Sequence, residues 1–361
     1  MQQTLKTTLR FGWTTGTCAT ASVYAAYTAM MTGSFPESVT IDTPSGKTAS
    51  LAISYTDTDG NAFTAGVIKD AGDDPDVTHG AEIRATIAPG VAASGIVFRG
   101  GEGVGIVTRP GLPVAVGEPA INPVPRQMMS DYIHALAEDL GGTSDVVITI
   151  SVPTGRLLAE KTWNPRLGIE DGISILGTTG VVRPFSCSAW IASIHRGIDV
   201  AVANALDHIA GSTGARSEAA VKTHYHLPTI ALIDMGDFVG GMLKYLRRHP
   251  VRRLTVAGGV GKMIKLAQGA TDLHSGRSQI DFSDLAARAK ILGLPAEHIA
   301  GANSALEVMQ NLNPDDRQTL ASAIALDALA TCRQVIGNTS TCLGTMVVDR
   351  EGQILSEQTE S

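Results

Sequence analysis

The sequence is short of cysteine, of charged residues and of long hydrophobic runs, and each shortage excludes a class of protein. Its four cysteines form no CxxC pair, which excludes a disulfide scaffold and favours a reducing cytoplasm. Charged residues make up 17% and the net charge is -7, so a nucleic-acid partner is not expected. No apolar run is long enough to span a membrane. These shortages indicate a cytoplasmic globular protein whose partner is a small molecule.

Common cofactor and catalytic motifs are missing as well. No glycine-bearing turn has the GxGxxG pattern of many NAD enzymes, and no GxSxG nucleophile elbow occurs. The segment GGVGK at 258–262 is only partly a phosphate loop, because Val256 and Met263 stand where Gly and Ser or Thr are required. His224 and His226 form the only close histidine pair and lack Cys or Glu at zinc-ligand spacing. No protein-bound metal is therefore expected.

The first half instead contains a series of segments rich in Gly, Pro and Asp. An ordinary turn needs one or two such residues, whereas longer runs allow backbone amides to approach a ligand closely. We interpret the segments as one extended small-molecule site. They are TTGTC (14–18), KDAGDDPDVT (69–78), GGEGVGIVTRPGL (100–112), INPVPR (121–126) and NPRLGIEDGISILGTTG (164–180).

Length and the order of patterns predict two domains of mixed α+β and α/β class. The chain exceeds the size at which a single core usually keeps growing. Residues 1–190 predict a mixed α+β domain with helices at 17–32 and 122–141 and a strand near 173–176. In residues 191–361, strand, glycine-bearing turn and helix alternate three times. That alternation predicts a Rossmann-like parallel sheet with ligands bound at the strand carboxyl ends.

The three glycine-bearing turns are the candidate cofactor site. Amides at helix N-termini bind carboxylates or ribose hydroxyls. Asp237, directly after Gly236, is a candidate acceptor for ribose hydroxyls, with an N-cap as the equal alternative. We expect cofactor contacts from Gly211, Thr213, Gly214, Gly236, Asp237, Gly258 and Gly259.

The segment at 69–78 concentrates carboxylates, whose mutual repulsion requires cations, amides or solvent to offset it. Three interpretations stay open: a solvated turn, a Mg²⁺ site, or a general base with a raised pKa beside a desolvated ligand. The candidates for the catalytic base are Asp70, Asp73 and Asp74.

Three arginines, Arg109, Arg126 and Arg166, each lie next to a proline within these segments. A fixed backbone can aim a guanidinium at a carboxylate. Each arginine alone is more often a surface ion-pair partner than a ligand contact. Their shared context favours a site for a polyanion.

In this order the segments resemble the cobalt-precorrin-5B C(1)-methyltransferase family, CbiD. The resemblance covers residues 9–345 and includes RFGWTTGTCATA (10–21), RPFSCSAWIASI (183–194), MGDFVGG (235–241) and LHS (273–275). It implies methyl transfer from S-adenosylmethionine to C-1 of a cobalt-containing tetrapyrrole in cobalamin biosynthesis, giving cobalt-precorrin-6A. The cobalt would belong to the substrate.

The resemblance also implies roles for the two domains. The first would bind the tetrapyrrole carboxylates, and the second would bind S-adenosylmethionine. A metal-free precorrin substrate and a non-catalytic corrinoid carrier are the alternatives. A homodimer and contacts with neighbouring pathway enzymes are further expected partners. The implied substrate contacts are Thr14, Thr15, Lys69, Arg109, Arg126 and Arg166.

Overall fold

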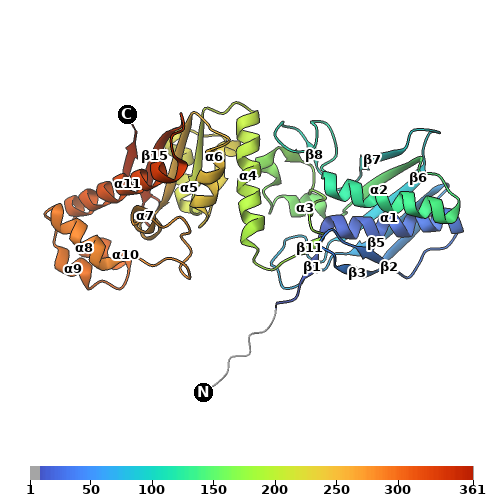
Figure 1. The fold of residues 1–361 in the computed structure, drawn as a ribbon, viewed down its shortest axis with the longest axis horizontal. Coiled ribbons are helices and arrows are strands. Elements are labelled where there is room, and N and C mark those ends of the chain that lie inside the picture. Colours follow the sequence, from blue (N-terminus) through green and yellow to red (C-terminus); the bar gives the residue numbers. More distant parts are fainter. Residues whose placement is uncertain (1–8, 361) are drawn as a thin grey trace, which may run out of the picture. The chain divides into compact units, whose positions relative to one another are not determined.

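The computed structural model describes residues 9–360 and has a mixed α/β fold with several sheets (Figure 1). Contacts divide the chain into two compact units, Met1–Ser186 (unit 1) and Cys187–Ser361 (unit 2). The boundary predicted from the sequence, after residue 190, lies inside the first turn of α4 (Cys187–Ala203). Because α4 packs through Ile194 and Ile198 into the core of unit 2, its first turn belongs to that unit.

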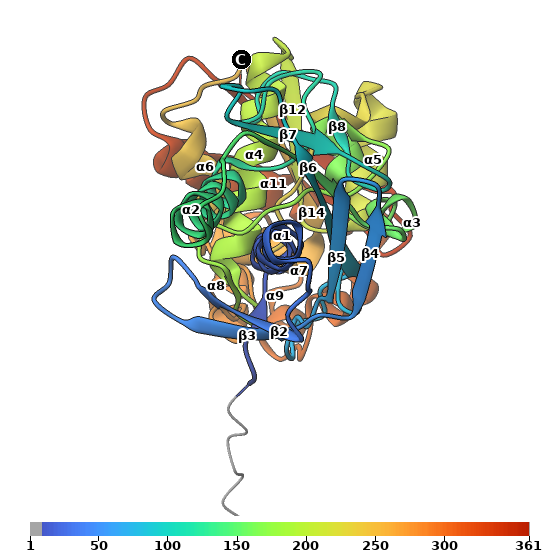
Figure 2. The same cartoon turned by 90° about the vertical axis from the view of Figure 1, so that its right-hand side faces the viewer.

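Unit 1 is built around α1 (Thr15–Thr32), which is buried along most of its length because its residues are small. The helix begins at the N-cap Thr14 and ends at Gly33, whose left-handed conformation closes the last turn. Figure 2 looks along α1 and shows α2 (Pro123–Leu140) on one side and the β2–β3 hairpin on another. The hairpin strands are β2 (Ser38–Asp42) and β3 (Thr48–Ala52).

A five-stranded sheet covers a further side of α1, in the order β4-β5-β6-β9-β7. Its pairs are antiparallel except β7–β9, which is parallel. Alternate residues of β6 and β9, such as Ile87 and Ile148, point into the core. The strands are β4 (Tyr55–Asp59), β5 (Ala62–Ile68), β6 (Glu82–Pro89), β9 (Val146–Ser151) and β7 (Ile96–Gly100).

Short elements join the remaining loops of unit 1. Strand β1 pairs with β11, and β8 pairs with β10. The strand predicted near 173–176 is wrong, because Ile173 and Ile175 bridge two different segments, at Val104 and Ile121, instead of forming a ladder. The elements are β1 (Gly12–Trp13), β8 (Ile106–Val107), α3 (Gly155–Ala159), η1 (Asn164–Leu167), β10 (Ile169–Glu170) and β11 (Val181–Val182).

Unit 2 contains a five-stranded sheet in the order β13-β12-β14-β15-β16, parallel except for the antiparallel edge strand β16. Buried residues on one sheet face pack with α5, and those on the other pack with α4, α6, α7 and α11. The strands are β12 (His208–Ser212), β13 (Leu232–Asp234), β14 (Arg253–Gly259), β15 (Cys342–Val348) and β16 (Ile354–Thr359). The helices are α5 (Ala215–Tyr225), η2 (Thr229–Ala231), α6 (Val239–Leu246), α7 (Val260–Ala267), α8 (Phe282–Ile291), α9 (Ala296–Ala300), α10 (Ala305–Asn311) and α11 (Pro314–Ile336).

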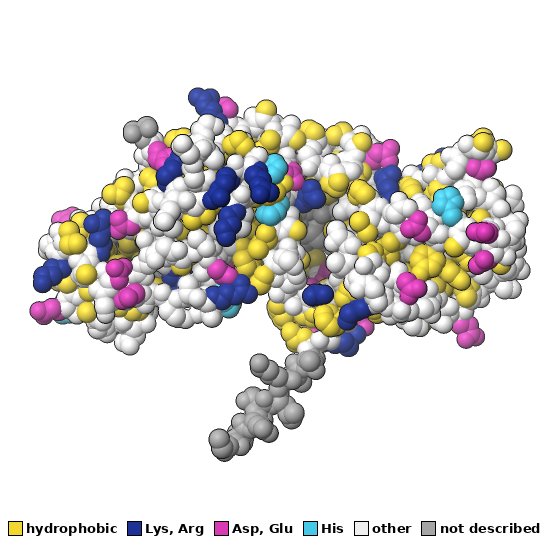
Figure 3. Space-filling view, viewed as in Figure 1, with side chains coloured by type: hydrophobic (Ala, Val, Ile, Leu, Met, Phe, Trp, Pro, Cys, Tyr) yellow, Lys and Arg dark blue, Asp and Glu magenta, His cyan; other side chains and the backbone are white. Residues whose placement is uncertain are grey.

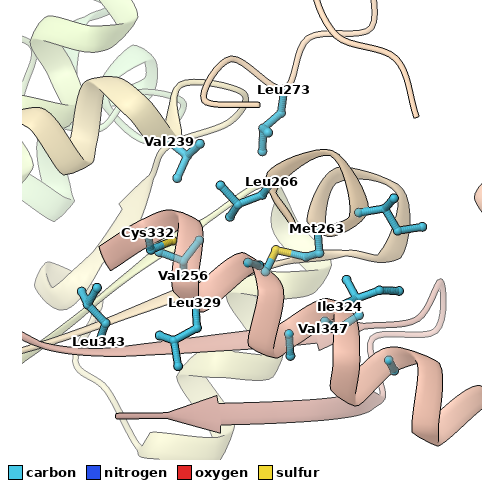
Figure 4. Close-up of a cluster of buried hydrophobic side chains, with 14 of the residues drawn as sticks. Val239, Val256, Met263, Leu266, Leu273, Ile324, Leu329, Cys332, Leu343 and Val347 are labelled. Carbon is cyan, nitrogen blue, oxygen red and sulfur yellow. The ribbon is translucent and has the colours of Figure 1, made fainter. Parts of the chain in front are cut away.

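The larger core of unit 2 lies between the sheet and α7 and α11. Figure 4 shows Val256 of β14 and Val347 of β15 facing Met263 and Leu329 from these helices. Among the described residues, α11 is the one helix with the length and composition to cross a membrane, and 56% of its most apolar window is buried inside the fold. Its apolar side chains therefore form core contacts.

Candidate functional site

The glycine-rich segments of unit 1 pack against one another. A Cβ added at Gly12 would lie 2.0 Å from the backbone of Ala71, and one at Gly103 would lie 2.0 Å from the carbonyl oxygen of Val152. A Cβ at Gly172 would lie 2.2 Å from the carbonyl oxygen of Gly103. Real side chains do not approach backbone atoms so closely. Contact between loops already accounts for Gly103 and Gly172 in the runs, and the interpretation of the runs as a ligand site stays a prediction.

Thr14 and Thr15 hold the start of α1 to the loop at 174–180. Thr14 Oγ1 accepts a hydrogen bond from the backbone N–H of Thr17 at 3.2 Å. Thr15 Oγ1 donates to the carbonyl oxygen of Leu176 at 3.2 Å and accepts from the N–H of Leu176 at 2.9 Å. Both side chains are buried. Their hydroxyls thus shape the loop, whereas contact with substrate stays a prediction.

Each candidate catalytic carboxylate accepts hydrogen bonds from within unit 1. Asp70 pairs with the Arg10 guanidinium through both of its oxygens, and Arg10 holds the pKa of Asp70 at about 2. Asp73 accepts from the Arg10 backbone N–H at 2.6 Å, and Asp74 accepts from the Phe185 N–H at 2.8 Å. Because a carboxyl with a pKa of about 2 is a weak base at neutral pH, Asp70 is poorly suited to remove a proton.

Lys69 lies in a buried ion pair. Its side chain is 1% exposed, and Nζ donates to Asp76 Oδ2 at 2.7 Å. Burial alone would raise the pKa of Asp76, but Lys69 and Thr78 hold it below its ordinary value. The geometry therefore gives Lys69 a structural role, and a substrate carboxylate would have to replace Asp76 to reach it. Among residues 9–360, no group of three or more His, Cys, Asp or Glu side chains is arranged to hold a metal ion.

The three predicted arginines lie on different elements of unit 1: Arg109 follows β8, Arg126 is in the first turn of α2 and Arg166 is in η1. Arg126 braces the segment before α2, since Nε donates to the Ile121 carbonyl oxygen at 2.8 Å and Nη2 lies 3.2 Å from Glu118. The side chain of Arg109 packs on Gly168, two residues after Arg166. Arg109 is exposed, and its guanidinium has no ion-pair or hydrogen-bond partner in the described part of the chain. Arg109 is thus the arginine best placed for an anionic ligand.

The strands of unit 2 extend further than the sequence predicts, which changes the role of two candidate glycines. Gly211 lies within β12, where a Cβ would be 2.4 Å from Met242 Sδ. Gly258 lies within β14, where a Cβ would be 2.9 Å from Met263 Sδ. Both positions require glycine because a methionine packs there, and neither lies in a turn. Strand β13, in contrast, begins only at Leu232, because residues 229–231 form η2.

Gly214, Gly236 and Gly259 do lie where the strands end. Gly214 and Gly259 cap α5 and α7, and a Cβ on either would meet nothing within 4 Å. Gly236 has φ 52°, a conformation that glycine adopts readily. Open space and exposed helix N-termini therefore occur together at the carboxyl edge of the sheet.

Lys262 of α7 connects these turns. Its Nζ lies 2.9 Å from Asp237 Oδ1 and donates to the carbonyl oxygen of Thr213 at 3.2 Å. The N-cap of α6 is Phe238, so the alternative role of Asp237 as a cap is wrong. One side chain thus joins the turns that follow β12 and β13 to the helix that follows β14.

Two buried oxygens at this edge lack a hydrogen-bond partner among the described residues. One is Ser212 Oγ, at the end of β12. The other is Asp237 Oδ1, which meets Lys262 as an ion pair without hydrogen-bond geometry. The other such side-chain atoms belong to Arg253, Thr339 and Thr341, near the starts of β14 and β15 at the opposite edge. The carboxyl edge can therefore accept further donors.

The segment that contains the LHS motif is held at the same edge. The Leu273 N–H donates to the carbonyl oxygen of Asp237 at 2.9 Å, and the Gly240 N–H donates to that of Thr271 at 2.9 Å. The Nζ of Lys265, which is nearly buried, donates to the carbonyl oxygen of Leu273 at 3.0 Å. Leu273 itself is buried and points into the core (Figure 4). Motifs that are distant in the sequence thus converge on the turn that carries Asp237.

Trp190 of α4 also lies at this edge, and sequence reasoning assigned it no role. Its Nε1 donates to the carbonyl oxygen of Asp234 at 3.0 Å, at the end of β13. Its ring stands 3.1 Å from the position that a Cβ on Gly236 would take. The signal available in the sequence was its place in the segment 183–194.

Sequence reasoning also overlooked a group of cations near the end of α6. Figure 3 shows Lys and Arg side chains gathered beside His side chains on unit 2. Tyr245 lies stacked between His195 and His249, with ring centroids 3.9 and 4.0 Å away. Arg247 donates to the Ile336 carbonyl oxygen at 3.3 Å and to the Val335 carbonyl oxygen, at the end of α11. At least this arginine stabilises a helix C-terminus.

The sequence matches known proteins along nearly its whole length. The family model CbiD matches residues 2–184, and the model described as CbiD, C-terminal domain, matches residues 272–359. Cobalt-precorrin-5B C(1)-methyltransferase of Paramagnetospirillum magneticum is 55% identical over 97% of this chain and 98% of its own length. The protein of that name from Bradyrhizobium sp. is 55% identical over 96% and 93%. A crystal structure of cobalamin biosynthesis protein CbiD from Archaeoglobus fulgidus is 27% identical over 74% of this chain and 83% of its own, with a TM-score of 0.41. On the family models and the two relatives at 55% identity, the chain belongs to the CbiD family.

Proposed function

We propose that this chain methylates C-1 of cobalt-precorrin-5B, a step of cobalamin biosynthesis that gives cobalt-precorrin-6A. The support is family membership together with 55% identity, over nearly the full chain, to proteins named for this reaction. S-adenosylmethionine is the proposed methyl donor, and the cobalt belongs to the substrate. When bound, the donor supplies an electrophilic methyl group on a sulfonium.

The proposed cofactor site is the carboxyl edge of the parallel sheet in unit 2, used in a Rossmann-like manner. The observation that carries this assignment is a pair of buried oxygens without a hydrogen bond among the described residues, Ser212 Oγ and Asp237 Oδ1, of which the second meets Lys262 in an ion pair. Buried polar atoms are almost always hydrogen-bonded, so a donor from a ligand would complete both. Ribose hydroxyls fit Asp237, and the open space at Gly214 and Gly259 leaves room for a carboxylate at the helix N-termini.

The proposed substrate site is the loop cluster of unit 1 around Arg109. Its exposed guanidinium can bind a peripheral carboxylate of the tetrapyrrole in a bidentate manner. Arg126 and Lys69 are held in contacts of their own, so we assign them to shaping the loops. Thr14 and Thr15 have the same supporting role. Arg166, in η1, is the second candidate for carboxylate binding.

Methyl transfer forms a C–C bond at C-1 and leaves the pair of electrons of the broken C–S bond on sulfur. The ring then needs to lose a proton to restore its charge. Asp73 and Asp74 are the remaining proton acceptors proposed from the chain, because the pKa of about 2 makes Asp70 unsuitable.

Calorimetric titration with S-adenosylmethionine and S-adenosylhomocysteine tests the cofactor site. We expect both to bind the full chain, Asp237→Ala to weaken binding at least tenfold, and Asp315→Ala to leave it unchanged. Asp315 is a matched control because it lies in the first turn of α11, away from the site. Absence of binding with and without tetrapyrrole would contradict the proposal and favour a corrinoid carrier.

A separate assay distinguishes the two substrate candidates. It compares turnover on the cobalt-loaded substrate with turnover on the metal-free substrate.

A further inference from the structure

Trp190 is a large aromatic side chain that the proposed chemistry leaves without a role. It is 42% exposed, although tryptophan is on average among the more buried residues. Its N–H is already satisfied by the carbonyl oxygen of Asp234. The exposed surface is therefore the apolar body of the ring, which is the part that gains most from contact with a ligand.

The surroundings of Trp190 fix the orientation of its ring. The helix that carries it is anchored in the core by Ile194 and Ile198, one and two turns further along. The bond from Nε1 to Asp234 ties the ring to the end of β13, and the ring of Phe238 lies 6.2 Å away at an interplanar angle of 56°. An aromatic ring held in this way loses little conformational entropy when a planar ligand stacks on it.

The turn under the ring carries Asp237. Gly236 adjoins Trp190 so closely that a Cβ would stand 3.1 Å from the ring, and Asp237 is the next residue. In the proposed function, Asp237 Oδ1 accepts from ribose hydroxyls. A purine base attached to that ribose would lie within one nucleoside length of Asp237, and the Trp190 ring stands against the preceding residue, Gly236.

We propose that the indole of Trp190 is the platform on which the adenine of the bound nucleoside stacks. This inference rests on the proposed function and names a residue that holds the base. Stacking requires no hydrogen bond to the base and no charge on the ligand. S-adenosylmethionine, S-adenosylhomocysteine and adenosine should therefore all depend on the ring to a similar degree.

Two variants and one control test the platform in the full-length protein. Trp190→Ala should weaken S-adenosylhomocysteine and adenosine binding about tenfold, which corresponds to about 1.4 kcal/mol. Trp190→Phe keeps a ring without the N–H and should weaken binding about threefold at most. Trp163→Phe, in unit 1, is the matched tryptophan control and should bind as the parent does.

Tryptophan fluorescence supplies a readout that a purely structural role would not change. Saturation with S-adenosylhomocysteine should quench emission in the parent and in Trp163→Phe, and the quenching should be lost in Trp190→Phe. In steady-state assays, Trp190→Ala should raise KM for S-adenosylmethionine about tenfold and leave KM for the tetrapyrrole unchanged.

The outcomes separate this inference from the function on which it rests. If the parent binds S-adenosylhomocysteine and Trp190→Ala binds it equally well, the platform is refuted and the cofactor site stands. If Trp190→Ala raises KM for the tetrapyrrole alone, the ring faces the macrocycle and the platform is also refuted. If the parent binds no S-adenosylhomocysteine even with tetrapyrrole present, both the platform and the cofactor site fail.

Discussion

Replacement of Lys262 by methionine tests whether one side chain holds the candidate cofactor site together. The substitution keeps the methylene chain and removes the charge. It deletes the 2.9 Å ion pair with Asp237 and the 3.2 Å hydrogen bond to the Thr213 carbonyl oxygen. Because these contacts link separate turns, their loss should weaken the contacts between the turns at the carboxyl edge of the sheet. The core of the sheet should stay unchanged.

The expected loss of free energy of unfolding depends on how exposed the Lys262–Asp237 pair is to solvent. The Lys262 and Asp237 side chains are 37% and 23% exposed, so solvent screens their attraction in part. An exposed pair contributes about 0.2–1 kcal/mol, and a hydrogen bond from a charged group contributes about 1.5–3 kcal/mol before that screening. We expect Lys262→Met to lower the free energy of unfolding by about 1–2 kcal/mol and S-adenosylhomocysteine affinity about tenfold.

A double-mutant cycle measures the energy of the contact between Lys262 and Asp237 by itself. Urea unfolding of Lys262→Met, Asp237→Asn and the double variant should give a coupling energy of about 1 kcal/mol between the two residues. Lys244→Met is the matched control, since Lys244 is an exposed lysine of α6. A coupling below about 0.3 kcal/mol, the range in which independent sites add, would refute the argument that Lys262 bridges the turns.

Two further predictions follow from single residues. Burial, aided by Arg253, lowers the pKa of His208 to about 4 from 6.5, so below pH 6.5 the unfolded chain binds a proton that the folded chain does not. The free energy of unfolding should fall between pH 6.5 and 4 by at most about 3 kcal/mol, or about 1–2 kcal/mol after screening. Denaturant titrations of His208→Gln should show a flatter pH dependence; an unchanged slope would assign the effect to other groups. For the proton acceptor, Asp73→Asn or Asp74→Asn should lower kcat about 10²-fold or more, and full turnover by both variants would exclude this loop.

The sequence was most informative where local signals and burial agree. Helix α2 starts after Asn122 with proline in its first turn and ends at Gly141, as its pattern predicts. Helix α1 ends at the predicted Gly33, and the small residues before it explain its burial. In unit 2 the repeated strand, turn and helix pattern predicted the parallel arrangement of β12, β13 and β14. These features depend on neighbours in the chain, which a sequence displays directly.

Sequence reasoning failed where the cause of a residue type lies in a distant segment. Gly103 and Gly172 are required by their mutual contact, and that contact joins residues almost seventy positions apart. Lys69 was expected to contact the substrate, but the loop at 69–78 folds so that Lys69 is buried in an ion pair with Asp76. No spacing rule distinguishes a glycine that faces a ligand from one that faces another loop. The same limit explains why Trp190 was overlooked.

The two units differ in how completely their motif residues are paired, and this difference indicates where ligand binding changes stability. In unit 1, Asp70, Thr15 and Lys69 have partners within the protein, so the loops keep their shape without a ligand. In the described part of unit 2, Ser212 Oγ is buried without a hydrogen-bond donor, and Asp237 Oδ1 meets the Lys262 ammonium as an ion pair without hydrogen-bond geometry. A buried oxygen left without a partner, as Ser212 Oγ is, costs about 1–3 kcal/mol, which a ligand donor would recover on binding. A ligand at this edge should therefore stabilise the turns that hold it, whereas a ligand in unit 1 meets loops that are already formed.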